Sequence, residues 1–365
     1  MEVRKLKINE HQNTRELWEL VFKEDTNSFL DYYYTQKTSE NEIYVIEEET
    51  KIRGMLQLNP YMLRMGGQEC QGHYIVAVAT HPEYRKQGIM RKLLHASLRE
   101  MYERKEAFTF LMPAAEAIYL PFDFRFVYNQ RQGRVVAKPN HTATAASLKL
   151  RQAKEADCEG VAEFAMQYLR DKDVYVKRDA AYYRCLIKEL KSENGGIMLI
   201  EQAGKLIGCY LYTNASEYII REPLFDKQQE IGLAEVIGSL SDAQESTNQE
   251  KALKCLAYEG DMAEVEEKPM IMARILHPEI VLREVKVNRE VQINIAIQDP
   301  IISENNRALR LVAKAGEYLS VCESAQEPDV TLGIGELTSI LFGYETNEKL
   351  AMIVPLDKIF LNEVV

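Results

Sequence analysis

One hairpin pattern occurs twice in the chain. The segment EIYVIEEETKIRGMLQL begins at residue 42, GIMLIEQAGKLIGCYLY begins at residue 196, and the two align without a gap. In each copy two alternating strands flank a polar turn, and a glycine, Gly54 or Gly208, lies where a bulge or a close approach is expected. Helix-rich segments precede both copies. The repeat predicts a duplicated α+β unit, and chance resemblance between two hairpins is the alternative.

Composition narrows the class of protein. The 365 residues are 46% hydrophobic, which suffices for two or three soluble domains. With 45 Lys and Arg against 56 Asp and Glu, the net charge of −11 argues against a nucleic-acid binder and mildly favours cationic small molecules. The six cysteines form no C-x-x-C pair, so we expect free thiols in a reducing cytoplasm. No apolar run approaches the roughly 18 residues of a spanning helix, and we expect no membrane contact.

A basic glycine turn follows only the first copy of the hairpin. In VAVATHPEYRKQGIMRKLL, from Val76 to Leu94, a strand-like run ends in R-x-x-G and a helix begins. The first N–H groups of a helix have no intrahelical partner and attract phosphate groups. Gly88 permits unusual backbone angles, while Arg85 and Lys86 add positive charge. The pattern predicts an anion-binding loop, and a solvated helix start with incidental basic residues is the alternative.

Two features stand out near the end of the chain. Gly333 and Gly335 match part of G-x-G-x-x-G, but Thr338 replaces the third glycine and no βαβ pattern surrounds it, so we expect a strand or turn. The chain ends in KIFLNEVV, which is largely apolar, whereas unanchored termini are usually polar. We therefore expect the end of the chain to be buried. A final strand packed for stability alone is the alternative.

The glycine turn resembles the acetyl-CoA pyrophosphate loop of the GNAT N-acetyltransferases, whose pattern is [RQ]-x-x-G-x-[GA] after the fourth strand. Arg85 and Gly88 match, and Met90 departs from the usual small residue. A bulky residue there is usual in the Eis branch, which comprises relatives of the mycobacterial enhanced intracellular survival protein. AAEAIYLPFDFRFVY, from Ala114, resembles that branch's helix and hairpin after the fifth strand, and the segment from Ile334 onward resembles its sterol-carrier-like last domain.

The resemblance implies a domain organisation and an activity. It implies an α+β chain with a catalytic GNAT mixed-sheet domain at residues 1–140, a GNAT-like domain without the CoA loop at 141–267, and a sterol-carrier-protein-like α/β domain at 268–365. The implied enzyme uses acetyl-CoA and no metal. It transfers an acetyl group to a primary amine of a cationic, aminoglycoside- or polyamine-like molecule, or to lysine, by direct attack in a ternary complex. A cytoplasmic homo-oligomer, hexameric by resemblance, is expected. The alternative is a non-catalytic carrier with an apolar ligand in the third domain.

The resemblance also assigns site residues. The residues implied to bind acetyl-CoA are Val78, Ala79, Thr80, Arg85, Lys86, Gln87, Gly88, Ile89, Met90, Arg91, Ala114 and Ala115. Tyr119 is the implied proton donor, although in the absence of the resemblance it reads as a core tyrosine. The implied base is the α-carboxylate of Val365. His73, His81 and His95 are rival bases, but none has an acidic partner at a local spacing, so we expect structural or surface roles for them.

Overall fold

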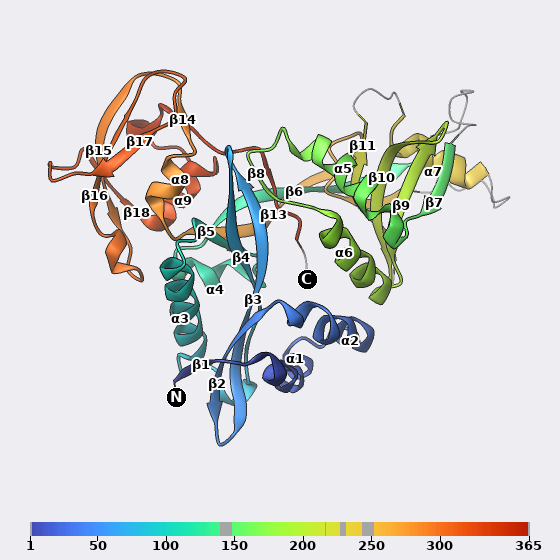
Figure 1. Cartoon of the computed structure of the whole chain (residues 1–365), viewed down its shortest axis with the longest axis horizontal. Helices are drawn as coiled ribbons and strands as arrows, with labels where there is room; N and C mark the ends of the chain where they lie inside the picture. The colour runs from blue at the N-terminus through green and yellow to red at the C-terminus, as the bar shows by residue number, and fades with distance from the viewer. Residues whose placement is uncertain (1, 139–147, 216, 227–230, 243–251, 364–365) are drawn as a thin grey trace.

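The computed structural model describes residues 2–138, 148–215, 217–226, 231–242 and 252–363. In these ranges a 14-stranded mixed sheet takes its strands from residues 3–275 and 359–360, and a four-stranded sheet lies in the last third of the chain. Figure 1 shows three parts around a common centre. The predicted α+β fold class is confirmed.

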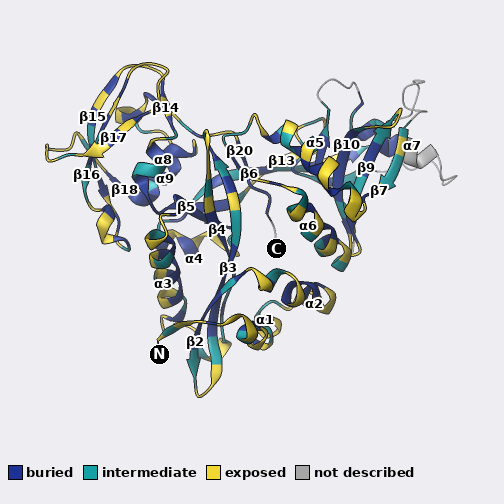
Figure 2. Cartoon of the chain, in the orientation of Figure 1, coloured by how far each residue is buried: buried dark blue, intermediate teal, exposed yellow. Residues whose placement is uncertain are grey.

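The first part surrounds strands β2 to β5. Its strands are β1 (Val3–Lys5), β2 (Glu42–Glu48), β3 (Lys51–Met65), β4 (Gln68–Thr80) and β5 (Phe108–Leu111), and its helices are α1 (Arg15–Val21), α2 (Asn27–Thr35), α3 (Ile89–Glu103) and α4 (Glu116–Tyr119). Helix α3 is amphipathic, because Leu94, Leu98 and Met101 face the sheet while charged residues face outward. Figure 2 shows these two sides of α3.

Both copies of the predicted hairpin are present. The second copy consists of β9 (Gly196–Gln202) and β10 (Lys205–Asn214). Ile46 pairs with Gly54 and Ile200 pairs with Gly208, and in each hairpin the register shifts just before the glycine. A Cβ atom at Gly54 would lie 2.3 Å from Cγ2 of Ile89, so the glycine lets α3 approach the sheet. The predicted bulges and the close approach are confirmed.

The second part continues the same sheet. Its other elements are β6 (Arg125–Val136), β7 (Leu148–Gln152), β8 (Val174–Val176), β11 (Tyr218–Phe225), β12 (Ala252–Leu256), β13 (Ala263–Ile275), α5 (Cys158–Leu169), α6 (Ala180–Ser192) and α7 (Leu233–Asp242). Strand β13 lies between β5 and β6 and pairs antiparallel with both. The chain therefore returns from the second part to complete the sheet of the first.

The third part packs on one face of that sheet. It contains β14 (Lys286–Val287), β15 (Val291–Gln298), β16 (Ala308–Ala313), β17 (Ser320–Glu323), β18 (Val330–Gly333), β19 (Ile353–Val354), α8 (Pro278–Leu282) and α9 (Ile334–Leu341). One apolar cluster joins Ile295 and Leu337 of this part to Phe108 and Ile275 of β5 and β13. Gly333 ends β18, which agrees with the expected strand or turn, whereas Gly335 lies in the first turn of α9, where that expectation is wrong.

The end of the chain leaves the third part and runs to the centre of the molecule (Figure 1). Strand β20 (Ile359–Phe360) pairs in parallel with β8, which also pairs with β3. Ile359, Phe360 and Leu361 are buried, so the predicted burial of the apolar end is confirmed as far as Glu363. Val364 and Val365 lie outside the described residues.

Two sequence expectations concern cysteines and membrane spans. All six cysteines are free thiols. Within the described ranges, no helix has both the length and the apolar character needed to cross a bilayer. In the same ranges, no three histidine, cysteine, aspartate or glutamate side chains converge in the manner of metal ligands.

Candidate active site

Strands β4 and β5 separate at the centre of the first part. They pair only at Tyr74 and Phe110, and β4 then continues to Thr80. Before it ends, β4 contains a bulge opposite Leu56, at which Ala77 has a φ of 51°. A bulge re-aims the backbone of the strand that carries it. Beyond Tyr74, the edge of β4 that faces β5 has no strand partner among the described residues, and an extended ligand can pair with such an edge.

Val78, Ala79 and Thr80 follow this bulge and therefore lie along the open edge. Because β4 and β5 are parallel, their carboxyl ends lie at the same side of the sheet. Ala114 and Ala115 come directly after β5 and are exposed. The structure thus brings these five predicted residues to the opening between the two strands.

The glycine turn leads from β4 into α3. Gly88 caps the helix with a φ of 78° and without a capping side chain, and Lys86 also has a positive φ, of 64°. The first bond of the helix runs from the N–H of Lys92 to the carbonyl of Gly88 at 3.1 Å. The N–H groups of Ile89, Met90 and Arg91 therefore have no intrahelical acceptor.

The space around this helix end is open. No atom lies within 4 Å of the position that a Cβ of Gly88 would take, and its positive φ disfavours other residues. Arg85, Lys86, Gln87 and Arg91 are exposed around the turn. Since it combines unpaired amides with positive side chains, the turn fits a pyrophosphate group. The side chain of Ile89 is buried, so only its backbone faces the opening.

Tyr119 ends the short helix α4 and is 7% exposed. It belongs to the apolar cluster that includes Ile75 and Val78 of β4, and its ring lies 5.9 Å from that of Phe124. Burial raises the pKa of Tyr119 to about 12. The hydroxyl is therefore protonated at neutral pH and can act as a hydrogen-bond donor.

A cavity of about 440 Å³ lies between the first two parts of the chain. Residues after α2, the middle of β3, helix α6 and strand β11 form its walls, and Asn362 and Glu363 bring the end of the chain into it. Its lining includes Tyr61, Tyr182 and Glu189. The cavity has the size of a small-molecule site and contains several carboxylates.

Two of these carboxylates are held by one buried arginine. The guanidinium of Arg178 forms ion pairs with Glu222 and with Glu363, the latter at 2.9 Å from Nη2 to Oε1. The hydroxyl of Tyr182 donates to the same Oε1 at 3.3 Å. The second oxygen of Glu363 is buried without a hydrogen-bond partner among the described residues, and burial raises the pKa of this carboxyl. A buried carboxylate oxygen without a partner is unusual and marks this end of the cavity as a candidate functional site.

A third carboxylate lies on α6. Oε2 of Glu189 accepts a hydrogen bond from the hydroxyl of Tyr32 at 3.2 Å, and burial raises the pKa of Glu189 to about 7. Sequence reasoning missed Arg178, Glu189 and Glu363. The one signal for them was a glutamate inside the apolar chain end, since a charge within a buried segment needs a partner.

The three histidines considered as bases lie elsewhere. His73 is buried, and its Nδ1 lies 2.8 Å from Oε1 of Glu106, which is also buried. This partner is distant in sequence, so local spacing gave no sign of it. The side chain of His81 accepts a hydrogen bond from the N–H of Glu83, and the exposed His95 lies against the ring of Phe122. Their positions agree with structural or surface roles.

Comparison with known families identifies two domains. Residues 2–127 match the family described as acetyltransferase (GNAT) domain, and residues 279–358 match the sterol carrier protein domain. The chain therefore contains a GNAT acetyltransferase domain and a sterol-carrier-like domain, and it is an enzyme of the acyltransferase class. No curated protein matches the sequence.

Solved structures with the same fold extend over almost the whole chain. A probable N-acyltransferase from Enterococcus faecalis V583 is 17% identical, with a TM-score of 0.80 over 97% of this chain and 93% of its own. A GCN5-related N-acetyltransferase from Anabaena variabilis is 18% identical, with a TM-score of 0.75 over 99% and 98%. Eis1 from Mycobacterium abscessus is 14% identical, with a TM-score of 0.68 over 97% and 94%. At these identities the likeness establishes a shared fold.

Proposed function

We propose that the protein transfers the acetyl group of acetyl-CoA to a primary amine of a cationic small molecule, aminoglycoside- or polyamine-like, or of lysine. The amine attacks directly in a ternary complex. The observation that carries the proposal is the meeting of three features in the first domain. These are the open edge of β4, the unpaired amides at the Gly88 turn after β4, and the packing of Tyr119 in the same apolar cluster as Val78.

Different groups of the chain bind different parts of acetyl-CoA. The N–H groups of residues 89–91, together with Arg85 and Lys86, hold the pyrophosphate. The backbone of Val78, Ala79 and Thr80 pairs with the extended pantetheine arm, and Ala114 and Ala115 border it from the side of β5. Acetyl-CoA supplies the thioester that the amine attacks.

Tyr119 supports the departure of the CoA sulfur. A thiol has a pKa of about 8.5, whereas burial raises the pKa of Tyr119 to about 12. Full transfer of its proton would cost about 5 kcal/mol at 1.36 kcal/mol per pKa unit. Tyr119 therefore acts as a hydrogen-bond donor to the developing thiolate.

The α-carboxylate of Val365 accepts the proton of the amine. A free alkylamine has a pKa of about 10.4 and must lose a proton to react. Val365 lies outside the described residues, and support comes from Glu363, which lines the cavity two residues earlier. Two residues span at most about 7 Å.

The carboxylates of the cavity support a cationic acceptor. Glu189, Glu222 and Glu363 line the cavity, and one oxygen of Glu363 has no partner among the described residues. An ammonium group of the acceptor supplies the positively charged partner that such an oxygen lacks. The carrier alternative has less support, because the apolar faces of β15 and α9 are packed against β5 and β13.

We also propose the three-domain division at residues 1–140, 141–267 and 268–365, a hexameric assembly and a cytoplasmic location. The first domain holds the cofactor loop and the third delivers the end of the chain. Strand β13 crosses the second boundary, so the last two domains share it.

The proposal is tested by measuring CoA release from acetyl-CoA with a panel of polyamines, aminoglycosides and lysine peptides. Turnover is expected with at least one cationic amine and should saturate in both substrates. Matched alcohols that lack the amine serve as controls. Equal CoA release with amines and alcohols, or none with any amine, contradicts the proposal.

A further inference from the structure

The turn that carries Tyr119 is too short to hold itself in place. Helix α4 has four residues and is followed by the 3-10 turn η4 (Leu120–Phe122) and by Asp123, whose φ is 60°. The local bonds that close this turn are Asp123 N–H to Leu120 O at 3.0 Å and Phe124 N–H to Tyr119 O at 3.4 Å. Isolated helical turns of this length are unstable, so the position of Tyr119 depends on outside contacts.

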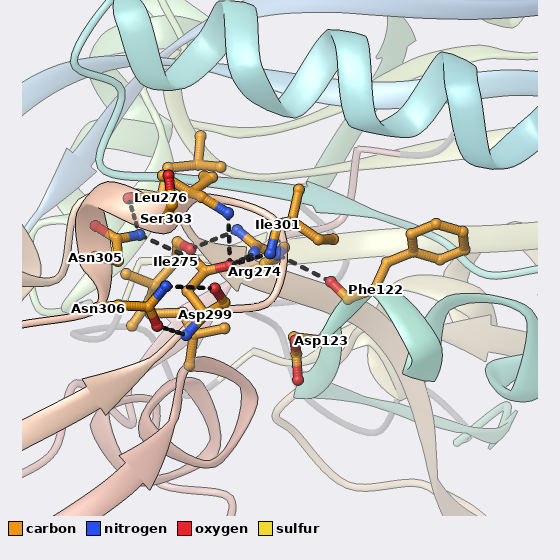
Figure 3. Close-up of polar contacts among 12 residues, drawn as sticks. Phe122, Asp123, Arg274, Ile275, Leu276, Asp299, Ile301, Ser303, Asn305 and Asn306 are labelled. Atoms are coloured by element: carbon orange, nitrogen blue, oxygen red, sulfur yellow. Dashed lines mark hydrogen bonds and ion pairs between the residues drawn. The ribbon is translucent and has the colours of Figure 1, made fainter.

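Arg274 of β13 provides one such contact. It points to the same side of β13 as Met272 and Leu276, which belong to the apolar cluster of Tyr119. Its Nε donates to the carbonyl of Phe122 at 2.9 Å, three residues after Tyr119. Figure 3 shows the guanidinium between this carbonyl and Asp299. The arginine is completely buried, so its charge requires a fixed partner.

The third domain supplies that partner. Oδ1 of Asp299 accepts from Nη2 of Arg274 at 2.6 Å and from the N–H groups of Ile301 and Ile302 at 2.9 Å each. Its Oδ2 accepts from the side chain of Asn305 at 2.9 Å (Figure 3). The carboxylate is thus fixed by the loop that follows β15, within the sterol-carrier-like domain.

A second arginine holds the same turn from another direction. Nη1 of Arg125 donates to the carbonyls of Phe124 at 2.9 Å and Leu120 at 3.4 Å. Its guanidinium lies over Gly335 of α9, where a Cβ atom would be 2.7 Å from Cζ of Arg125. The third domain therefore fits closely against both arginines that bind the turn.

We propose that Arg274 is a positioning residue for Tyr119 and that the sterol-carrier-like domain, through Asp299, holds Arg274 in place. The inference rests on the proposed role of Tyr119. Loss of the contact to Phe122 releases the turn and displaces the tyrosine hydroxyl from the opening. Displacements of about 1 Å in a catalytic group cost up to 10²-fold in rate. The third domain thus contributes to acetyl transfer without contacting either substrate there.

The test is a double-mutant cycle on kcat with Arg274→Met and Tyr119→Phe. Arg274→Met is expected to lower kcat about 10- to 100-fold and to leave the KM for acetyl-CoA within about twofold. In the Tyr119→Phe background it should have almost no further effect, because the group that it positions is already gone. Arg274→Lys keeps the charge and one donor and should restore part of the activity.

Two other variants complete the design. Gly335→Ala displaces only the far end of Arg125, so it should fold, and it should lower kcat in the wild type but not in Tyr119→Phe. It tests the support that the third domain gives to the turn through Arg125, and Arg274→Lys carries the test of Arg274 if Arg274→Met does not fold. Arg307→Met is the control, since Arg307 pairs with Glu279 and Glu323 and does not bind the turn.

The outcomes separate the two claims. Equal losses from Arg274→Met, or from Arg274→Lys if the first variant does not fold, in both backgrounds would show a general structural effect and overturn the positioning role alone. Full activity of Tyr119→Phe would overturn both this inference and the proposed role of Tyr119. A loss of activity that occurs when Tyr119 is present and not in Tyr119→Phe supports the inference.

Discussion

Glu363 accepts a hydrogen bond of 2.9 Å from Nη2 of Arg178, and both side chains are buried. The last described residue is thereby fixed to the second domain at the edge of the cavity. Because the same arginine also pairs with Glu222 on β11, the end of the third domain and the wall of the second meet at one guanidinium. The described end of the chain therefore lies at the cavity that we propose for the acceptor.

A C-terminal extension should abolish most of the activity. If the Val365 carboxylate accepts the proton of the amine, a peptide bond at that position removes the base, and loss of a general base typically costs 10²- to 10⁴-fold. Val365→Ala keeps the carboxylate and should retain substantial activity. Deletion of residues 364 and 365 moves the carboxylate by up to about 7 Å and should be as inactive as the extended chain. An intact tagged enzyme with full turnover would refute the terminal base.

The turn at Gly88 should be required for acetyl-CoA binding. Gly88→Val opposes the positive φ and fills the open space, so it should weaken binding at least tenfold in calorimetry. Gly204→Val is the matched control, since Gly204 has the same φ of 78° and equally open surroundings in the second hairpin. Arg85→Ala should weaken binding less. Equal affinities for the Gly88 and Gly204 variants would count against the loop.

Tyr119→Phe should lower kcat far more than it changes the KM for acetyl-CoA. The hydroxyl is needed chiefly while the sulfur departs, and such losses appear in kcat, here about 10²-fold. Tyr44→Phe is the control, because Tyr44 is similarly buried on β2 and its hydroxyl contacts Glu42. Steady-state kinetics of the two variants distinguish catalysis from packing. The same kcat in both variants would show that Tyr119 only packs in the core.

Glu189 should make the stability of the protein depend on pH. Burial raises the pKa of this carboxyl to about 7, above its value of about 4.3 in the unfolded chain. The folded state therefore binds the proton more tightly, and the stability from Glu189 is complete below about pH 4 and is lost as the pH rises towards 7. Relative to the wild type, Glu189→Gln should be more stable at pH 8 than at pH 5. Urea denaturation at both values, with the exposed Glu163→Gln on α5 as control, measures the difference, and parallel profiles would contradict the assignment.

Local patterns predicted the parts of the site that are local in sequence. The hairpin repeat, the bulges at Gly54 and Gly208 and the glycine cap of α3 depend on residues within a few positions of one another, and the structure contains them. The apolar run at Ile359 likewise predicted burial. Each of these patterns is specified by backbone geometry and hydrophobic alternation.

The contacts that join distant segments gave much weaker signals. Nothing in the local pattern of β13 specifies pairing with β5, because register between distant strands depends on tertiary packing. The pair His73 and Glu106 was hidden for the same reason. The sequence did contain a signal for Arg274. It interrupts the apolar run MIMARIL, and a charge in a buried strand indicates a specific partner.

Acetylation of the acceptor amine tests the central claim most directly. The purified protein would be incubated with acetyl-CoA and an equimolar panel of cationic amines, and the products would be identified by mass spectrometry. The account predicts an amine that gains an acetyl group on nitrogen at a rate proportional to enzyme, with loss of product formation in Gly88→Val and retention in Gly204→Val. Acetyl-CoA consumed without any acetylated amine, or equal product from the two glycine variants, would contradict it.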